Sequence, residues 1–183
     1  MSHLPFVQLI VMGVSGSGKS TMAGALGEAF NLCVTDGDDL HLPASVQKMQ
    51  SGIPLTDDDR WPWLDRVAAR LQSALEPNSP QAGRVIACSA LRLAYRDHLR
   101  RQVPNLRFVF LHGDAKLLQQ RMADRTGHFM HSHMLDSQLA TLEIPGKDEP
   151  DVFTLQAGQD IPSKVALIAA AFKLESRAAS SVV

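Results

Sequence analysis

Short apolar runs alternate with longer amphipathic stretches along this chain. The runs have the length of buried strands, and they occupy residues 6–12, 31–35, 84–88, 106–112 and 151–155. Between and after them the pattern predicts helices over about residues 19–30, 43–50, 57–75, 91–101, 115–125 and 162–174. Strands that alternate with helices indicate βαβ units, and therefore a parallel sheet with helices on both faces.

The chain length of 183 residues fits one domain, so we expect a single α/β domain over residues 1–183 with a central parallel sheet and three layers. Its composition, 45% hydrophobic and 20% charged, is that of an ordinary globular protein. Ligands of such sheets bind beyond the carboxyl ends of the strands. The main polar motifs each follow a predicted strand, so we expect them to meet at one edge of the sheet.

A glycine-rich turn joins the first predicted strand to the first helix. Residues 13–20 read Gly-Val-Ser-Gly-Ser-Gly-Lys-Ser and match the GxxxxGK[ST] pattern completely. Glycines allow close backbone approach, and successive N–H groups at a helix start bind phosphate oxygens. Lys19 supplies a cation for the β and γ phosphates, and the Ser20 hydroxyl is placed to bind Mg²⁺. The residues predicted to bind the nucleotide here are Gly13, Ser15, Gly16, Ser17, Gly18, Lys19, Ser20 and Thr21.

An acidic turn, Asp36-Gly37-Asp38, follows the second predicted strand, and His41 comes shortly after it. The glycine-rich motif alone does not separate a kinase from an ATPase, a GTPase or a regulator, whereas phosphoryl transfer also needs charge neutralisation and a positioned acceptor. One carboxylate can hold Mg²⁺ and the other can act as base. We assign Asp36 to the metal and Asp38 to the acceptor, and the reverse order stays open. An ordinary polar turn is the alternative.

Basic side chains recur near the end of the fifth predicted helix. Arg121 and Arg125 are four residues apart and His128 follows three later, so they share one face if the helix continues. This spacing favours a lid over about residues 121–140 that closes over ATP, with Arg125 neutralising developing charge. Arg121 would stack on the adenine beside the turn at 158–161. The alternative is a solvated helix face whose arginines pair with neighbouring aspartates.

Two further cations, Lys48 and Arg60, flank residues 52–55. Either could bind a carboxylate or phosphate of the acceptor. Arg60 is the better candidate, because a guanidinium grips a carboxylate with two hydrogen bonds. For Lys48 a surface role is the alternative. Trp61 and Trp63 are interpreted as structural, because aromatic side chains bury large areas.

Charge and cysteine content narrow the possible partners. The formal net charge of −1 and a pI of about 6.6 argue against nucleic acid as a partner. The two cysteines form no CxxC pair, which disfavours a disulfide scaffold or zinc site and favours a reducing cytoplasm. The apolar run over residues 6–14 is too short to span a bilayer, so no membrane association is expected.

Taken in order, the motifs resemble the gluconate kinase (gluconokinase) family, from about Ile10 to Asp151. Beyond the glycine-rich turn, the specific segments are Asp-Asp-Asp-Arg-x-Pro-Trp-Leu at 57–64 and Cys-Ser-Ala-Leu at 88–91. Gly-His-Phe at 127–129 and Ser-Gln at 137–138 also fit. Arg92 stands where the family usually has Lys.

The resemblance implies transfer of phosphate from ATP to the 6-hydroxyl of D-gluconate. It also implies a fold like that of shikimate and adenylate kinases with a helical lid, and commonly a homodimer. The substrate carboxylate would meet Arg60 or a lid arginine, and its hydroxyls would meet Asp38, His41 and Ser89. The resemblance and the lid motif together predict that the acceptor is bound by Asp38, His41, Lys48, Arg60, Ser89, Arg125 and His128.

Two other functions stay open at the level of sequence. The first is another small-molecule kinase of the same fold, acting on shikimate or a nucleoside monophosphate, against which the segment at 57–64 argues. The second is a nucleotide-binding sensor or scaffold without turnover. Such a protein would tolerate loss of Asp36, Asp38, Arg121 and Arg125, all of which this chain keeps.

Overall fold

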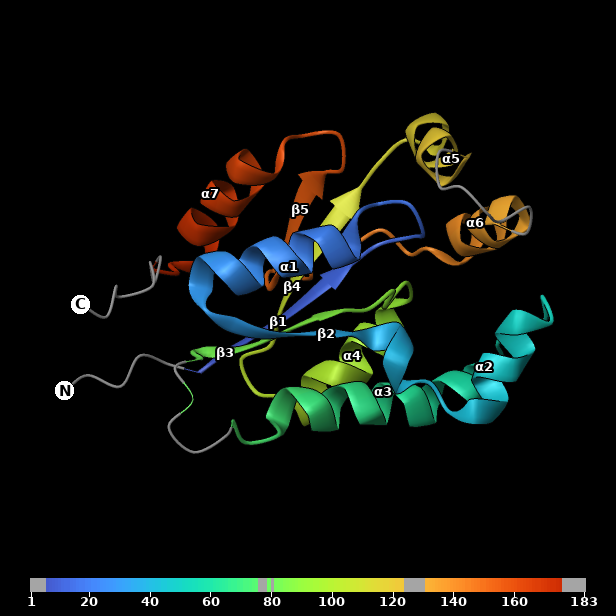
Figure 1. The fold of residues 1–183 in the computed structure, drawn as a ribbon, viewed down its shortest axis with the longest axis horizontal. Coiled ribbons are helices and arrows are strands. Elements are labelled where there is room, and N and C mark those ends of the chain that lie inside the picture. Colours follow the sequence, from blue (N-terminus) through green and yellow to red (C-terminus); the bar gives the residue numbers. More distant parts are fainter. Residues whose placement is uncertain (1–5, 76–78, 80, 124–130, 176–183) are drawn as a thin grey trace.

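The central sheet consists of five strands, β1 (Val7–Met12), β2 (Leu32–Asp36), β3 (Gly83–Ala87), β4 (Arg107–His112) and β5 (Val152–Gln156). The computed structural model describes residues 6–75, 79, 81–123 and 131–175. The strands follow the order β2-β3-β1-β4-β5, and all of their pairings are parallel (Figure 1). Each strand begins and ends within one residue of the apolar run that predicted it. The predicted parallel sheet is therefore confirmed.

Helices cover both faces of this sheet. One face carries α1 (Lys19–Phe30) and α7 (Ile161–Phe172), and the other carries α3 (Asp57–Gln72) and α4 (Leu93–Gln102) (Figure 1). Alternating side chains of β1 serve the two layers, because successive residues of a strand point to opposite faces. Leu9 and Val11 pack with α1 and α7, whereas Ile10 and Met12 pack with α3 and α4. The predicted three-layer arrangement is confirmed.

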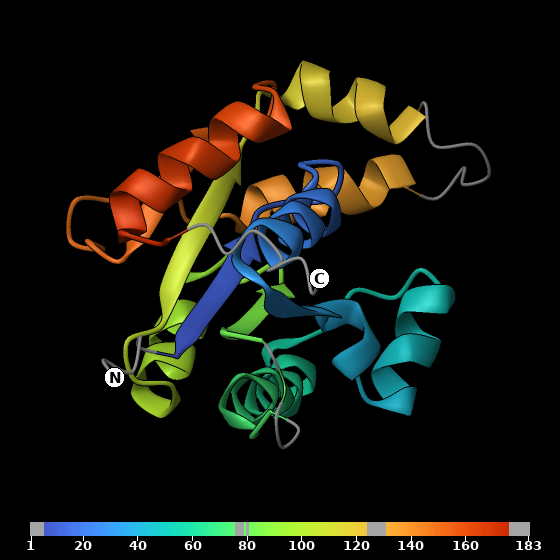
Figure 2. The same cartoon turned by 60° about the vertical axis from the view of Figure 1, so that its left-hand side comes forward.

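Further helices lie beyond the carboxyl ends of the strands. They are α2 (Pro43–Gln50), α5 (Ala115–Ala123) and α6 (His131–Thr141), and a short 3-10 helix, η1 (Gly37–Leu40), follows β2 (Figures 1 and 2). The segment expected as a lid thus contains α6, a helix that is not among those predicted. A small apolar cluster joins α5 and α6 to the glycine-rich turn through Val14, Leu91, Leu118, Met122 and Leu135.

Three predicted helix ends were wrong by two or three residues, and local structure explains each. Helix α7 ends at Phe172 instead of 174, because Lys173 has a left-handed backbone with a φ of +53°. Helix α3 ends at Gln72 instead of 75, because Arg84 draws the chain away by donating to the carbonyls of Ser73 at 3.1 Å and Ala74 at 2.9 Å. Helix α4 begins at Leu93 instead of 91, because its N-cap residue Arg92 has an extended backbone with a φ of −98° and a ψ of 147°.

Candidate active site

The glycine-rich turn lies between β1 and α1 and runs directly beneath α5. Gly13, Gly16 and Gly18 have φ values of +142°, +81° and +94°, which a residue with a β-carbon adopts only with strain. A β-carbon on Gly16 would also lie 3.1 Å from the Leu118 carbonyl oxygen. The Lys19 ammonium folds back over the turn and donates to the Val14 carbonyl at 3.1 Å. The turn thus has the backbone form that the motif predicts.

The structure brings together the two residues predicted to bind Mg²⁺. The Ser20 hydroxyl on α1 donates to one carboxylate oxygen of Asp36 at the end of β2, at 2.9 Å. The other oxygen of Asp36 accepts from the backbone N–H of Asp38 at 3.1 Å. Hydrogen bonds to both of its oxygens therefore fix the orientation of the Asp36 carboxylate next to Ser20. A hydroxyl beside a carboxylate is an oxygen donor set that fits Mg²⁺ when phosphate oxygens and water complete it.

Protein side chains alone would not enclose that ion. Within the described part of the chain, no group of three or more His, Cys, Asp or Glu side chains is arranged to hold a metal. This agrees with the habit of Mg²⁺ in phosphoryl-transfer sites, where one or two protein ligands act with the nucleotide.

His41 is buried just after η1, 8% exposed, and stacks on Trp63 with 4.4 Å between ring centroids and 10° between planes. Trp63 is itself fixed, because its indole N–H donates to the Gly37 carbonyl at 2.7 Å. Burial lowers the pKa of His41; the nearby Asp38 opposes this shift and Arg60 adds to it. The ring is therefore neutral at neutral pH. Its buried Nδ1 has no hydrogen-bond partner among the described residues, which is costly unless a ligand supplies one.

Arg60 lies in a network with Asp57, Arg92 and Tyr95. Its guanidinium donates to the Tyr95 hydroxyl at 3.1 Å and lies 3.6 Å from Asp57. Arg92 donates to the other oxygen of Asp57 at 2.8 Å, and the Tyr95 hydroxyl also donates to Asp57. Together these contacts, with that of Tyr95 first, lower the pKa of Asp57. Two guanidiniums share one carboxylate here, so donors remain for an anionic acceptor.

Lys48 is engaged with a different carboxylate. Its ammonium contacts both oxygens of Asp59, at 2.6 and 2.8 Å. Asp59 and Thr56 form the capping box of α3, and these contacts lower the Asp59 pKa to about 2. Lys48 thus connects α2 to the start of α3, and its binding of the acceptor stays a prediction. Ser89 lies closer to the turn, since its carbonyl accepts from the Gly13 N–H at 3.4 Å.

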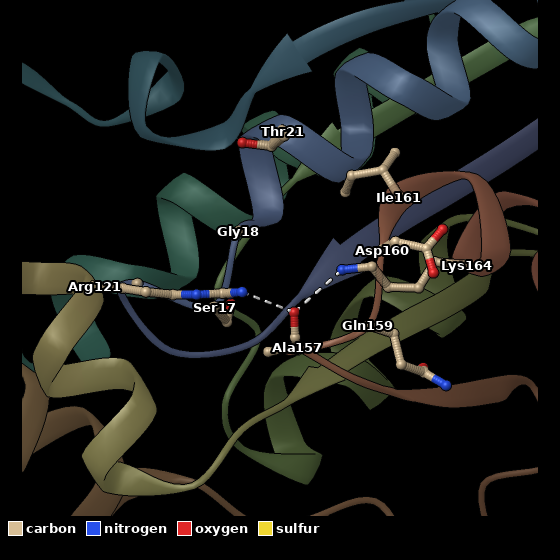
Figure 3. Close-up of a pocket in the computed structure, with 10 residues that line it drawn as sticks. Ser17, Gly18, Thr21, Arg121, Ala157, Gln159, Asp160, Ile161 and Lys164 are labelled. Carbon is tan, nitrogen blue, oxygen red and sulfur yellow. Dashed lines mark hydrogen bonds between the residues drawn. The ribbon is translucent and has the colours of Figure 1, made fainter.

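A pocket of about 360 Å³ opens beside the glycine-rich turn (Figure 3). Five of the predicted nucleotide-binding residues line it: Gly16, Ser17, Gly18, Thr21 and Arg121. The turn between β5 and α7 forms its other wall, with Gln159, Asp160 and Ile161. Arg121 spans the two walls by donating to the Ala157 carbonyl at 3.1 Å. Arg121 and the turn between β5 and α7 therefore lie next to each other, as the sequence predicts for residues that would bind the base together.

Known proteins show similarity along most of the chain. The family model described as "AAA domain" matches residues 9–133. The thermoresistant gluconokinase of Escherichia coli (strain K12) is 42% identical over 157 residues, which are 86% of this chain and 88% of that protein. The chain belongs to the gluconokinase family. The crystal structure of a gluconokinase from Sinorhizobium meliloti 1021 is 44% identical and superposes with a TM-score of 0.80, covering 93% of this chain and 94% of that one.

The gluconokinase fold also extends to more distant structures. Shikimate kinase from Aquifex aeolicus is 11% identical and superposes with a TM-score of 0.56 over 91% of this chain and 96% of its own. This likeness concerns the fold alone and confirms that the predicted shikimate kinase-like architecture was right. In the part of the chain that the structure describes, no helix has the length and apolar character to cross a membrane.

Two predicted residues of the gluconokinase site, Arg125 and His128, lie outside the described residues. From the sequence, Arg92 and Gln138 are noted only as positions of the family pattern, without a role, and Lys164 is missed; the geometry brings in all three. Arg92 follows β3 and could have been found by the rule that ligands bind at the carboxyl ends of strands. Lys164 gave no signal, because lysines are almost never buried.

Proposed function

We propose that this protein transfers the γ-phosphoryl group of ATP to the 6-hydroxyl of D-gluconate. The observation that carries the proposal is the meeting of the Ser20 hydroxyl with Asp36 at 2.9 Å, next to Asp38. This contact joins the phosphate-binding turn to the acidic turn in a chain of the gluconokinase family. Asp36 can hold Mg²⁺ beside the phosphates, and Asp38 in the same turn is placed to act on an acceptor.

On the donor side, the backbone of the glycine-rich turn and Lys19 bind the β and γ phosphates. Ser20 and Asp36 are the residues that would hold Mg²⁺, which supplies charge neutralisation for the transferring group when bound. Arg121 lies over the base pocket, and Arg125 is proposed to reach the transferring phosphoryl from the lid.

On the acceptor side, Asp38 is proposed as the base that accepts the proton of the 6-hydroxyl. Its backbone N–H donates to Asp36 at 3.1 Å, and it is the Asp36 carboxylate that meets Ser20. His41 offers a neutral ring nitrogen to a hydroxyl of gluconate, and Ser89 offers a hydroxyl. This division supports Asp36 as the metal-side carboxylate.

The carboxylate of gluconate is proposed to meet Arg60, with Arg92 beside it. Both guanidiniums lie within 6 Å of the Tyr95 ring centroid, at 5.7 and 5.8 Å, so they are held as a pair. Lys48 and His128 are further candidates for contacts to the acceptor. We also propose a homodimer that works in the cytoplasm, as the resemblance and the cysteine content suggest.

An acceptor panel tests the proposal. ADP release with ATP and Mg²⁺ is measured for D-gluconate, related sugar acids, shikimate and nucleoside monophosphates. Gluconate is expected to give the highest kcat/KM. If gluconate gave only background ADP release while shikimate or a nucleotide supported turnover, the proposed acceptor would be wrong. A lack of turnover with every acceptor would favour the sensor alternative.

A further inference from the structure

Lys164 is a buried cation in the wall of the base pocket. It sits in the first turn of α7, is 3% exposed, and lines the pocket with Arg121 and Asp160 (Figure 3). Its ammonium donates to the Ala157 carbonyl at 3.3 Å. No carboxylate in the described part of the chain forms a salt bridge with it.

This arrangement leaves Lys164 incompletely satisfied. An ammonium has three N–H donors, and the contact with Ala157 uses one of them. Burial lowers the pKa of Lys164, and the neighbouring Arg121 lowers it further, against the attraction of Asp160. A buried ammonium with unused donors is costly until a ligand offers acceptor atoms. The ligand that fits this pocket is the base of the phosphoryl donor.

The hydrogen bonds of the Ala157 carbonyl bear on which base the pocket can bind. It accepts from Arg121 at 3.1 Å and from Lys164 at 3.3 Å, as Figure 3 shows, so both of its lone pairs are used. It is therefore a poor partner for an exocyclic amino group. Around this carbonyl the pocket therefore presents donors, from Arg121 and Lys164. A purine with an oxygen at position 6 offers two acceptors on one edge, O6 and N7, whereas adenine offers the N7 acceptor and an amino group there.

Asp160 adds acceptor atoms that also suit a purine with an oxygen at position 6. It is the N-cap residue of α7 and lines the same pocket as Lys164. A carboxylate has about four acceptor positions, more than its bond to the Ser163 N–H uses. A 6-oxopurine presents an N–H next to O6, which matches a carboxylate placed beside an ammonium.

We propose that Lys164 is a specificity-determining residue for the base of the phosphoryl donor, and that it allows 6-oxopurine triphosphates, GTP and ITP, to serve beside ATP. The inference rests on the proposed function only in naming the triphosphate as phosphoryl donor. The base contact itself does not depend on the acceptor. Lys164 acts through the 6-oxygen, so ITP, which lacks the 2-amino group of GTP, behaves like GTP.

A competition binding assay tests the role of Lys164 in base selectivity, and it needs no phosphoryl acceptor. ATP, GTP and ITP each displace a fluorescent ADP analogue from the wild-type protein and from Lys164→Met, whose side chain has similar length and no donor. In the wild type, GTP and ITP compete within about tenfold of ATP. In Lys164→Met, GTP and ITP weaken by about tenfold and ATP by less than about threefold. Lys164→Arg keeps a donor and keeps the selectivity, and the exposed Lys147→Met serves as control.

The proposal is overturned if GTP and ITP fail to compete in the wild type, a result that needs no variant. It is also overturned if Lys164→Met weakens all three nucleotides equally. Thermal melting of each variant shows whether the fold is kept. A separate turnover assay with gluconate distinguishes this result from a failure of the proposed function, because a wrong acceptor abolishes turnover and leaves the base selectivity unchanged.

Discussion

The Gln138 side chain on α6 accepts a hydrogen bond from the backbone N–H of Ser15 in the glycine-rich turn, with 2.6 Å between Oε1 and N. The two residues are 123 positions apart in sequence, and the bond places α6 directly on the phosphate-binding turn. Val14 and Leu135 meet in the same region within one apolar cluster. The geometry indicates that α6 supports the turn from the side opposite to α1.

Loss of this bond should weaken ATP binding. Gln138→Ala removes one partly buried hydrogen bond, a loss of about 1 kcal/mol, so the KM for ATP is expected to rise about fivefold. Gln138→Glu keeps the acceptor oxygen but adds a negative charge beside the phosphates, so it should weaken ATP binding as well. Gln119→Ala changes an exposed glutamine on α5 and serves as control. An unchanged ATP KM in Gln138→Ala would show that α6 does not position the turn.

Asp38 is expected to be essential for transfer and dispensable for nucleotide binding. Asp38→Asn removes the base and keeps the size, so kcat should fall by about 10²- to 10⁴-fold while ATP affinity is kept. Asp39→Asn alters the exposed neighbour in η1 and should leave kcat near the wild-type value. Steady-state kinetics and nucleotide binding measure the two effects. Wild-type turnover in Asp38→Asn would show that another group acts as the base.

His41 is expected to act through a ring nitrogen. His41→Phe keeps the stacking on Trp63 and removes the unpartnered Nδ1, so the KM for gluconate should rise about fivefold with little change in the KM for ATP. Because burial lowers the His41 pKa from its ordinary value of 6.5, the ring is mainly neutral at pH 6.5 and above, and this contact persists over that range. Equal gluconate KM values for the variant and the wild type would show that His41 does not bind the acceptor.

The Lys48–Asp59 pair predicts a pH effect on stability. The folded pKa of Asp59 is about 2, below its ordinary value of 3.8, so its ionised form stabilises the fold above about pH 3.8 and this contribution is lost as pH falls toward 2. Lys48→Met should raise the Asp59 pKa, as NMR titration would detect. It should lower the melting temperature more at pH 6 than at pH 2. An unshifted Asp59 carboxyl would contradict the pairing.

The strands and the phosphate-binding turn could be predicted because their signals are local. Apolar runs mark buried parallel strands, and the glycine spacing fixes the turn. Helix α6 was missed, although Leu135, Leu139 and Leu142 repeat at helical spacing within it and just after it. Contacts between distant segments, such as that of Lys48 with Asp59, could not be predicted, because they depend on where the folded chain places each helix.

The proposed reaction is defined by its acceptor and by the atom that is phosphorylated. The most direct measurement is phosphorus NMR of the product formed from ATP, Mg²⁺ and D-gluconate by the intact protein. We predict one new phosphomonoester signal, coupled to the protons on carbon 6 of gluconate, that grows in step with ADP. ADP formation without such a product, or a phosphate on another carbon, would contradict the proposed reaction.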